Sequence, residues 1–197
     1  MNNPVAQVVE QHPFKVMVVG SNPTGITKKL LQFNYCILVK NVVAYSMVKK
    51  KKIVIFDLDG TLALIDKRRA ISTKDNGKMD WAKFFDPDMV DLDDPNTPVI
   101  TMANLLSSKY RIWILSGRSD VTHQATVDWL SKNGVDYDHL VMRPQNHLYM
   151  PDNDLKQMWL DSIGKDNVAM VFDDRQQVVD MWRDNGLTTF QVADGDF

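Results

Sequence analysis

An alternation of short apolar runs with amphipathic stretches fills the chain from about residue 98 onward, and it restricts the fold more than any other feature. The apolar runs have the length of buried strands, and the amphipathic stretches have the apolar spacing of helices. Strands that alternate with helices indicate a parallel sheet, so we predict an α/β fold with a Rossmann-like three-layer arrangement. We predict strands over 110–115, 139–142, 167–172 and 187–192, and helices over 99–108, 119–132, 152–163 and 176–184.

A further apolar run, residues 53–56, is followed at once by two aspartates, Asp57 and Asp59. Residues i and i+2 of an extended strand share a face, so both carboxylates leave the strand end on the same side, and Gly60 lets the backbone turn. Two carboxylates this close repel each other unless a cation lies between them or one is protonated. The pattern predicts a Mg²⁺ site in which one carboxylate attacks and the other carries a proton. An acidic turn at a strand end is the alternative.

Composition limits the classes of function. The 197 residues favour one domain with a small insertion, and a hydrophobic content of 44% is enough for a core. The net charge of -2 argues against a broad surface that coats nucleic acid, but not against a site that grips one strand end. Cys36 is the single cysteine, which excludes a disulfide framework and fits a reducing cytosol. With no membrane-spanning run and no signal-peptide layout, we expect a cytoplasmic protein without membrane contact.

Residues 1–46 differ in character from the rest of the chain. Residues 20–27 imitate a phosphate-binding P-loop, but Ile26 stands where that loop needs a lysine. Two stretches of the same region resemble peptides translated from a tRNA gene. We therefore predict that residues 1–46 are a non-native or disordered leader, produced by reading through such a gene. The protein proper would start at Met47 and form one domain over 47–197.

Residues 63–98 separate the first strand from the regular alternation. The segment is long and polar, and segments of this kind inside a compact domain are usually functional. We predict a small insertion, or cap, after the first strand. Its Trp81, Phe84 and Phe85 have helical spacing and form either a lid over the site or a surface that packs on the sheet. Arg68 is a candidate phosphate ligand, because guanidinium groups match phosphate oxygens.

Four separate segments follow strands or begin helices of the predicted sheet. In sheets of this kind ligands bind at the carboxyl ends of the strands, so the four segments should meet there. Together they offer an acidic side for a metal and a cationic side for a phosphate, although each alone could be an ordinary turn, cap or helix surface. The segments are Asp57 with Asp59, Ser116 with Gly117 and Arg118, Lys156, and Asp173 with Asp174.

These motifs resemble those of the haloacid dehalogenase (HAD) superfamily of phosphohydrolases, from about residue 51 to residue 197. The first motif of the superfamily resembles residues 56–61, the second Ser116, the third Lys156 and the fourth Asp173 with Asp174. Within the superfamily the chain is similar to the 3'-phosphatase domain of phage polynucleotide kinase-phosphatases. That likeness is carried by residues 116–118, 172–183 and 191–197 and by Arg68.

The resemblance implies a HAD-like fold and a Mg²⁺-dependent phosphomonoesterase. Asp57 would attack phosphorus to form an aspartyl-phosphate, and Asp59 would protonate the leaving sugar oxygen and then activate water. Mg²⁺ would be held by Asp57, the backbone carbonyl of Asp59, and Asp173 or Asp174. Asp152 would either orient Lys156 or cap the helix. The implied catalytic residues are Asp57, Asp59, Ser116, Arg118 and Lys156, and the implied substrate-binding residues are Arg68, Thr61, Gly117, Arg143 and Asp152.

We therefore expect an enzyme that removes 3'-phosphates from DNA or RNA ends during nucleic-acid repair. If a bacteriophage encodes it, it would act in the host cytoplasm. A 5'(3')-nucleotidase or another small-molecule phosphatase on the same scaffold is the alternative among enzymes, and a non-catalytic binding module is the alternative outside them. The kinase half of the family is absent from this sequence unless a separate chain encodes it, so a separately encoded kinase or ligase is a candidate partner.

Overall fold

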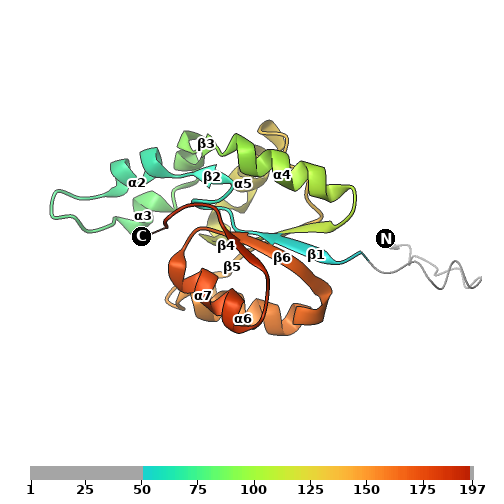
Figure 1. Ribbon diagram of the computed structural model, residues 1–197. Helices are drawn as coiled ribbons and strands as arrows, with labels where there is room; N and C mark the ends of the chain where they lie inside the picture. Colours follow the sequence, from blue (N-terminus) through green and yellow to red (C-terminus); the bar gives the residue numbers. More distant parts are fainter. Residues whose placement is uncertain (1–50, 196–197) are drawn as a thin grey trace, which may run out of the picture. The chain divides into compact units, whose positions relative to one another are not determined.

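The structure is a computed structural model that describes residues 51–195, and its centre is a five-stranded parallel sheet (Figure 1). The strand order is β5-β4-β1-β6-β7, so β1, which carries the Asp57 motif, is the middle strand. The predicted α/β class and parallel sheet are confirmed, whereas the predicted leader, residues 1–46, lies outside the described residues. The strands are β1 (Ile53–Phe56), β4 (Arg111–Ser119), β5 (His139–Arg143), β6 (Val168–Asp173) and β7 (Thr189–Gln191).

Helices cover both faces of this sheet. Figure 1 shows α4 (Thr97–Ser107) and α5 (His123–Lys132) on one face, and α6 (Asp152–Ile163) and α7 (Gln176–Asp184) on the other. Alternate residues of β1 enter the two cores, so the whole strand is buried. This burial on both sides explains why β1 is a continuous apolar run and not an alternating one.

The helices and strands agree with the sequence predictions to within a few residues. The first turn of the helix predicted over 119–132 is a 3-10 helix, η2 (Asp120–Thr122), which Ser119 caps by accepting a hydrogen bond from the backbone of Val121. The proposed capping role of Asp152 is wrong, because Pro151 occupies the N-cap of α6. The Asp152 carboxylate forms ion pairs instead.

The segment between β1 and α4 folds as the predicted insertion. A two-stranded antiparallel pair closes its base and two short α-helices and a 3-10 helix fill it. The 3-10 helix packs against α5, and the Trp129 indole of α5 donates a 2.9 Å hydrogen bond to the backbone oxygen of Asp93. The insertion is thereby fixed beside the sheet end that carries Asp57. Its elements are β2 (Ala63–Leu64), α2 (Asp66–Ser72), α3 (Trp81–Phe84), η1 (Pro87–Leu92) and β3 (Asp94–Pro95).

Candidate active site

The four predicted motif segments meet at the carboxyl end of the sheet. Asp57 directly follows β1, Asp173 ends β6, and the aromatic rings of Phe56 and Phe172 that precede them stack at 4.5 Å. A cavity of about 800 Å³ opens at this edge. Of the predicted site residues, the following line it: Asp57, Asp59, Gly117, Arg118, Arg143, Asp152, Lys156, Asp173 and Asp174.

Lys156 joins the two strand ends. Its ammonium group donates to Asp57 Oδ1 at 2.5 Å and to Asp173 Oδ2 at 2.9 Å, and all three side chains are buried. Burial raises the pKa of Asp57 well above its ordinary value, and Lys156 only partly offsets this effect. Burial also opposes the charge on Lys156, but Asp173 and Asp57 outweigh it and raise the pKa of the ammonium. Lys156 therefore stays cationic and balances the carboxylates around it.

Three carboxylates at this point form a group that could hold a metal ion. Asp57, Asp173 and Asp174 each offer an oxygen, and these oxygens lie within 4.8 Å of one another. Asp174 Oδ1 accepts a 3.0 Å hydrogen bond from the hydroxyl of Thr61, while Asp174 Oδ2 is buried without a partner. Burial, reinforced by Asp173, raises the pKa of Asp174 to about 6. Carboxylate oxygens suit hard divalent cations, and an orphaned buried oxygen is the kind of atom that such an ion satisfies.

Two glycines make room for Asp174. Gly60 has a φ of 94°, and a Cβ atom there would lie 2.2 Å from Asp174 Oδ2. A Cβ atom at Gly195 would lie 2.3 Å from the same oxygen. No side chain fits at either position without displacing the carboxylate. The turn after Asp59 and the C-terminal segment therefore both depend on glycine to hold this ligand in place.

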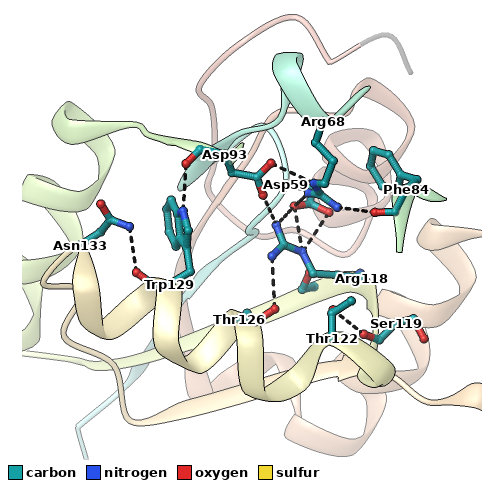
Figure 2. A network of polar contacts seen from close by, with 11 residues as sticks. Asp59, Arg68, Phe84, Asp93, Arg118, Ser119, Thr122, Thr126, Trp129 and Asn133 are labelled. Carbon is teal, nitrogen blue, oxygen red and sulfur yellow. Dashed lines mark hydrogen bonds and ion pairs between the residues drawn. The ribbon is translucent and has the colours of Figure 1, made fainter. Parts of the chain in front are cut away.

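Asp59 belongs to a separate network of four charges (Figure 2). Its carboxylate accepts hydrogen bonds from Arg118 and, at 2.7 Å, from Arg68. The same two arginines bind Asp93, Arg68 through Nε at 2.9 Å and Arg118 through Nη2 at 2.8 Å. Arg68 also donates to the backbone oxygen of Phe84. The insertion thus contributes two of the four charged side chains, Arg68 and Asp93, and binds Asp59 directly through Arg68.

The network sets the charge of Asp59. Burial by itself would raise the pKa of Asp59, but Arg118 and Arg68 outweigh it and lower the pKa to about 2. Asp93 differs, because its burial prevails over the same two arginines and its pKa is raised. In this arrangement Asp59 is ionised at neutral pH. Arg68 is fully buried and does not line the cavity, so its predicted role as a phosphate ligand stays a prediction.

Arg143 and Asp152 form a second ion-paired group in the lining of the cavity. Arg143 donates to Asp152, to the backbone oxygen of Gly117 at 2.8 Å, and to the backbone oxygens of His147 and Met150. All three guanidinium nitrogens are therefore engaged within the protein, and the predicted contact with a polynucleotide stays a prediction. A Cβ atom at Gly117 would lie 2.6 Å from Asp152 Oδ1, so only glycine admits this carboxylate.

Three other predicted roles look different once the side chains are placed. Ser116 is buried outside the cavity lining, and its hydroxyl accepts a hydrogen bond from the backbone of Arg118. The hydroxyl of Thr61 is used on Asp174 and not on the cavity. Asp152 makes no hydrogen bond to Lys156, although its charge helps to raise the pKa of the ammonium.

Sequence reasoning missed Asp93. It is one of three aspartates in a short polar stretch, and only its burial distinguishes it from its neighbours. A buried aspartate is rare without a cationic partner, but burial inside an irregular insertion leaves no periodic signal in the sequence.

Comparison with known proteins identifies the family. Residues 51–197 match the family model described as the polynucleotide kinase PNKP phosphatase domain of the HAD type. The chain belongs to this family. The predicted resemblance is thereby confirmed, and so is the HAD-like fold with an insertion after the first strand. No helix among residues 51–195 is long and apolar enough to cross a membrane.

Relatives of the phosphatase domain include a viral protein and two solved complexes. A "Putative bifunctional polynucleotide kinase/RNA ligase" from Autographa californica nuclear polyhedrosis virus is 34% identical over 181 residues, which are 87% of this chain and 24% of that protein. Two structures of the Pnkp1/Rnl/Hen1 complex, one described as an RNA repair complex, each match with 35% identity and a TM-score of 0.60. Each match covers 76% of this chain, and the two matches cover 48% and 45% of the respective chains in the complexes.

A more distant structure shares the fold alone. It is a HAD-family enzyme from Bacteroides thetaiotaomicron, solved with magnesium and inorganic phosphate, at 15% identity and a TM-score of 0.51 over 75% of this chain and 96% of that one. The chain spans about half the length of the Pnkp1 chains and about a quarter of the viral protein. The viral relative comes from a baculovirus, so the predicted phage origin stays a prediction, as does the leader over residues 1–46.

Proposed function

We propose that this chain is a Mg²⁺-dependent phosphatase that removes 3'-phosphates from the ends of polynucleotides. The observation that carries the proposal is the buried group at the carboxyl end of β1, where Asp57 meets Lys156 beside Asp173 and Asp174 in a PNKP phosphatase fold. Asp57 is the nucleophile. Its Oδ1 is held by an ammonium group, its neighbours supply the oxygens for a cation, and the cavity gives a substrate access to it.

The residues around Asp57 divide the work of the reaction. Asp57 attacks phosphorus and forms an aspartyl-phosphate, which splits one difficult displacement into two steps. Lys156, released from part of its contact with Asp57, stabilises the charge on the phosphoryl oxygens together with Arg118, which lines the same cavity. Asp59 is ionised in the free site, so it takes up a proton when the bound phosphate draws Arg118 away from it, transfers this proton to the leaving oxygen, and later takes one from water.

Mg²⁺ fits the acidic side of this site. Asp57 and Asp174 would hold it, with the backbone carbonyl of Asp59. We favour Asp174 over Asp173 as the ligand. Asp173 Oδ2 already accepts hydrogen bonds from Lys156 and Trp182, whereas Asp174 Oδ2 has no partner. When bound, the cation screens the Asp57 carboxylate from the negative phosphate and so permits their approach.

We propose polynucleotide ends as the substrate on the basis of how the relatives of this chain are named. The viral protein is named as a putative bifunctional polynucleotide kinase/RNA ligase, and one of the two Pnkp1/Rnl/Hen1 structures is named as an RNA repair complex. We infer that this phosphatase domain likewise works beside a kinase and a ligase on nucleic-acid ends. A 5'(3')-nucleotidase on the same scaffold is the second candidate, because the cavity of about 800 Å³ also has room for a whole mononucleotide.

One assay tests the function and its alternatives. Phosphate release is measured with Mg²⁺ from a 3'-phosphorylated oligonucleotide, a 5'-phosphorylated oligonucleotide and a 3'-mononucleotide. We expect the 3'-phosphorylated oligonucleotide to be the preferred substrate, and Asp57→Asn to reduce its turnover by at least about a thousandfold with the fold intact. Asp161→Asn, an exposed change on α6, is the matched control and should leave turnover unchanged. Preference for the mononucleotide would support the nucleotidase, and no release from any substrate would support a binding module.

A further inference from the structure

The cavity around Asp57 has an apolar mouth that the chemistry of phosphate transfer does not require. Apolar side chains line it from two directions. Trp81 and the half-buried Phe85 come from the insertion, and Leu148 and Tyr149 come from the loop before α6. A phosphate group fills only a small part of about 800 Å³. Since all of these residues line one cavity, a substrate whose phosphate reaches Asp57 keeps its attached nucleoside among them.

Trp81 is an exposed ring on a firm base. It stacks on Phe85 at 5.8 Å with an interplanar angle of 20°, and it meets the Phe84 ring edge-on at 5.7 Å. Phe84 in turn packs under the Arg68 guanidinium, 4.3 Å from its ring centre, in the network of Figure 2. Although three aromatic rings support one another here, Trp81 is still 60% exposed. Contacts with Phe84 and Phe85 account for the buried part of the indole. They do not account for the larger part that is exposed.

Tyr149 lines the same cavity from a loop that is held in place. Arg143 donates to the backbone oxygens of His147 and Met150, which bracket the tyrosine, and to Asp152 at the start of α6. The Tyr149 side chain is 99% exposed. An aromatic ring that makes no packing contribution, on a loop fixed by a buried arginine, has the character of a binding group and not of a core residue.

We propose that Trp81 and Tyr149 form a nucleobase-binding site at the mouth of the catalytic cavity, which stacks on the unpaired bases at the 3' end of a single strand. This inference rests on the proposed function and specifies its substrate. Aromatic rings stack on every base, so the site recognises a single-stranded end without reading its sequence. The net charge of -2 agrees with a site for one strand end, because it argues against a broad basic surface that would bind a long stretch of backbone.

The test compares two oligonucleotides that differ in one base. Both carry a 3'-phosphate, but the second ends in an abasic tetrahydrofuran in place of its terminal nucleoside. With the full chain and Mg²⁺, we expect kcat/KM to be about tenfold or more higher for the intact end. Trp81→Ala and Tyr149→Ala should each lower kcat/KM for the intact end several-fold, mainly through KM, with little change for the abasic end. Trp81→Phe should retain most of the preference.

Leu105→Ala is the matched control, because Leu105 is 66% exposed on α4 and lies outside the cavity lining. This variant should leave kcat/KM unchanged for both the intact and the abasic end. Equal turnover of the two ends by the unaltered chain would overturn the stacking site while leaving the phosphatase function standing. An equal loss on both substrates in Trp81→Ala would also overturn it, since that loss would mark a structural role. No release from either end would refute the proposed function itself.

A binding measurement gives a readout that does not depend on turnover. In the Asp57→Asn background, a 3'-phosphorylated single strand should quench tryptophan fluorescence on titration. The quenching should largely disappear when Trp81→Phe is added, because none of the other four tryptophans lines the cavity. Unchanged quenching in the double variant would contradict a base stacked on Trp81.

Discussion

Asp59 and Asp93 share one donor atom, the Nη2 nitrogen of Arg118 (Figure 2). Asp93 makes no hydrogen bond to Asp59, so Arg118 and Arg68 link the two carboxylates, whose like charges also repel each other directly. Arg118 also lines the catalytic cavity. In the proposed mechanism, a phosphate that draws the Arg118 guanidinium toward itself would weaken its hold on Asp59. The pKa of Asp59 would then rise at the step in which this residue must carry a proton.

Asp93→Asn tests the buried charge network. The change leaves Arg68 and Arg118 with Asp59 as the one carboxylate of the network, and an unbalanced buried charge is costly. We expect the free energy of unfolding to fall by about 3 kcal/mol, measured by urea denaturation. Asp94→Asn is the matched control at the next position, where the carboxylate pairs with Lys67 on the surface, and it should cost less than about 1 kcal/mol. Equal losses in the two variants would contradict the network.

The low pKa of Asp59 predicts a pH dependence of stability. Because the folded-state pKa, about 2, lies below the ordinary 3.8, ionised Asp59 stabilises the fold above pH 4. This stabilisation is lost as the pH falls from about 4 toward 2. We expect Asp59→Asn to lower the melting temperature at pH 7, and the difference from the unaltered chain to narrow on acidification. Thermal scans in EDTA between pH 7 and pH 2.5 measure this difference in melting temperature. A difference that does not depend on pH would refute the stabilising role of ionised Asp59.

The regular part of the fold was predictable because each strand and helix has its own periodic signal. The position of Asp57 and Asp59 followed from β1, and those of Lys156 and Asp173 from the strand-end rule. The exact partners of the arginines were not predictable. Arg68 and Arg143 looked like free cations in the sequence, but the fold brings buried carboxylates and backbone oxygens to them from distant segments. Such convergence depends on how irregular segments pack, which residue spacing does not encode.

Thr61→Val tests the acidic side of the site. The hydroxyl of Thr61 orients Asp174, and valine keeps its shape without the donor. Partners of this kind typically change metal affinity by about 10- to 100-fold. We expect the Mg²⁺ concentration for half-maximal turnover to rise by at least about tenfold, and EDTA to stop turnover in both proteins. Thr101→Val, on the exposed face of α4, should leave the Mg²⁺ requirement unchanged. Turnover that persists in EDTA would disprove the metal site.

Arg143→Lys tests whether this arginine anchors the loop or contacts the substrate. Lysine keeps the charge but offers one nitrogen in place of three, so most of the bonds to Gly117, His147, Met150 and Asp152 are lost. We expect faster amide hydrogen exchange over residues 147–150, together with a several-fold higher KM for the intact 3' end because Tyr149 is no longer held at the cavity mouth.

The abasic end separates the two roles of Arg143. If the arginine only anchors the loop, Arg143→Lys should raise KM much less for the abasic end, which has no terminal base to stack on. If it contacts the phosphate or the backbone of the strand, KM should rise equally for both ends and hydrogen exchange over 147–150 should stay as it is. Lys132→Arg, at a surface pair with Asp91, serves as the control for a change of cation type and should alter neither measurement.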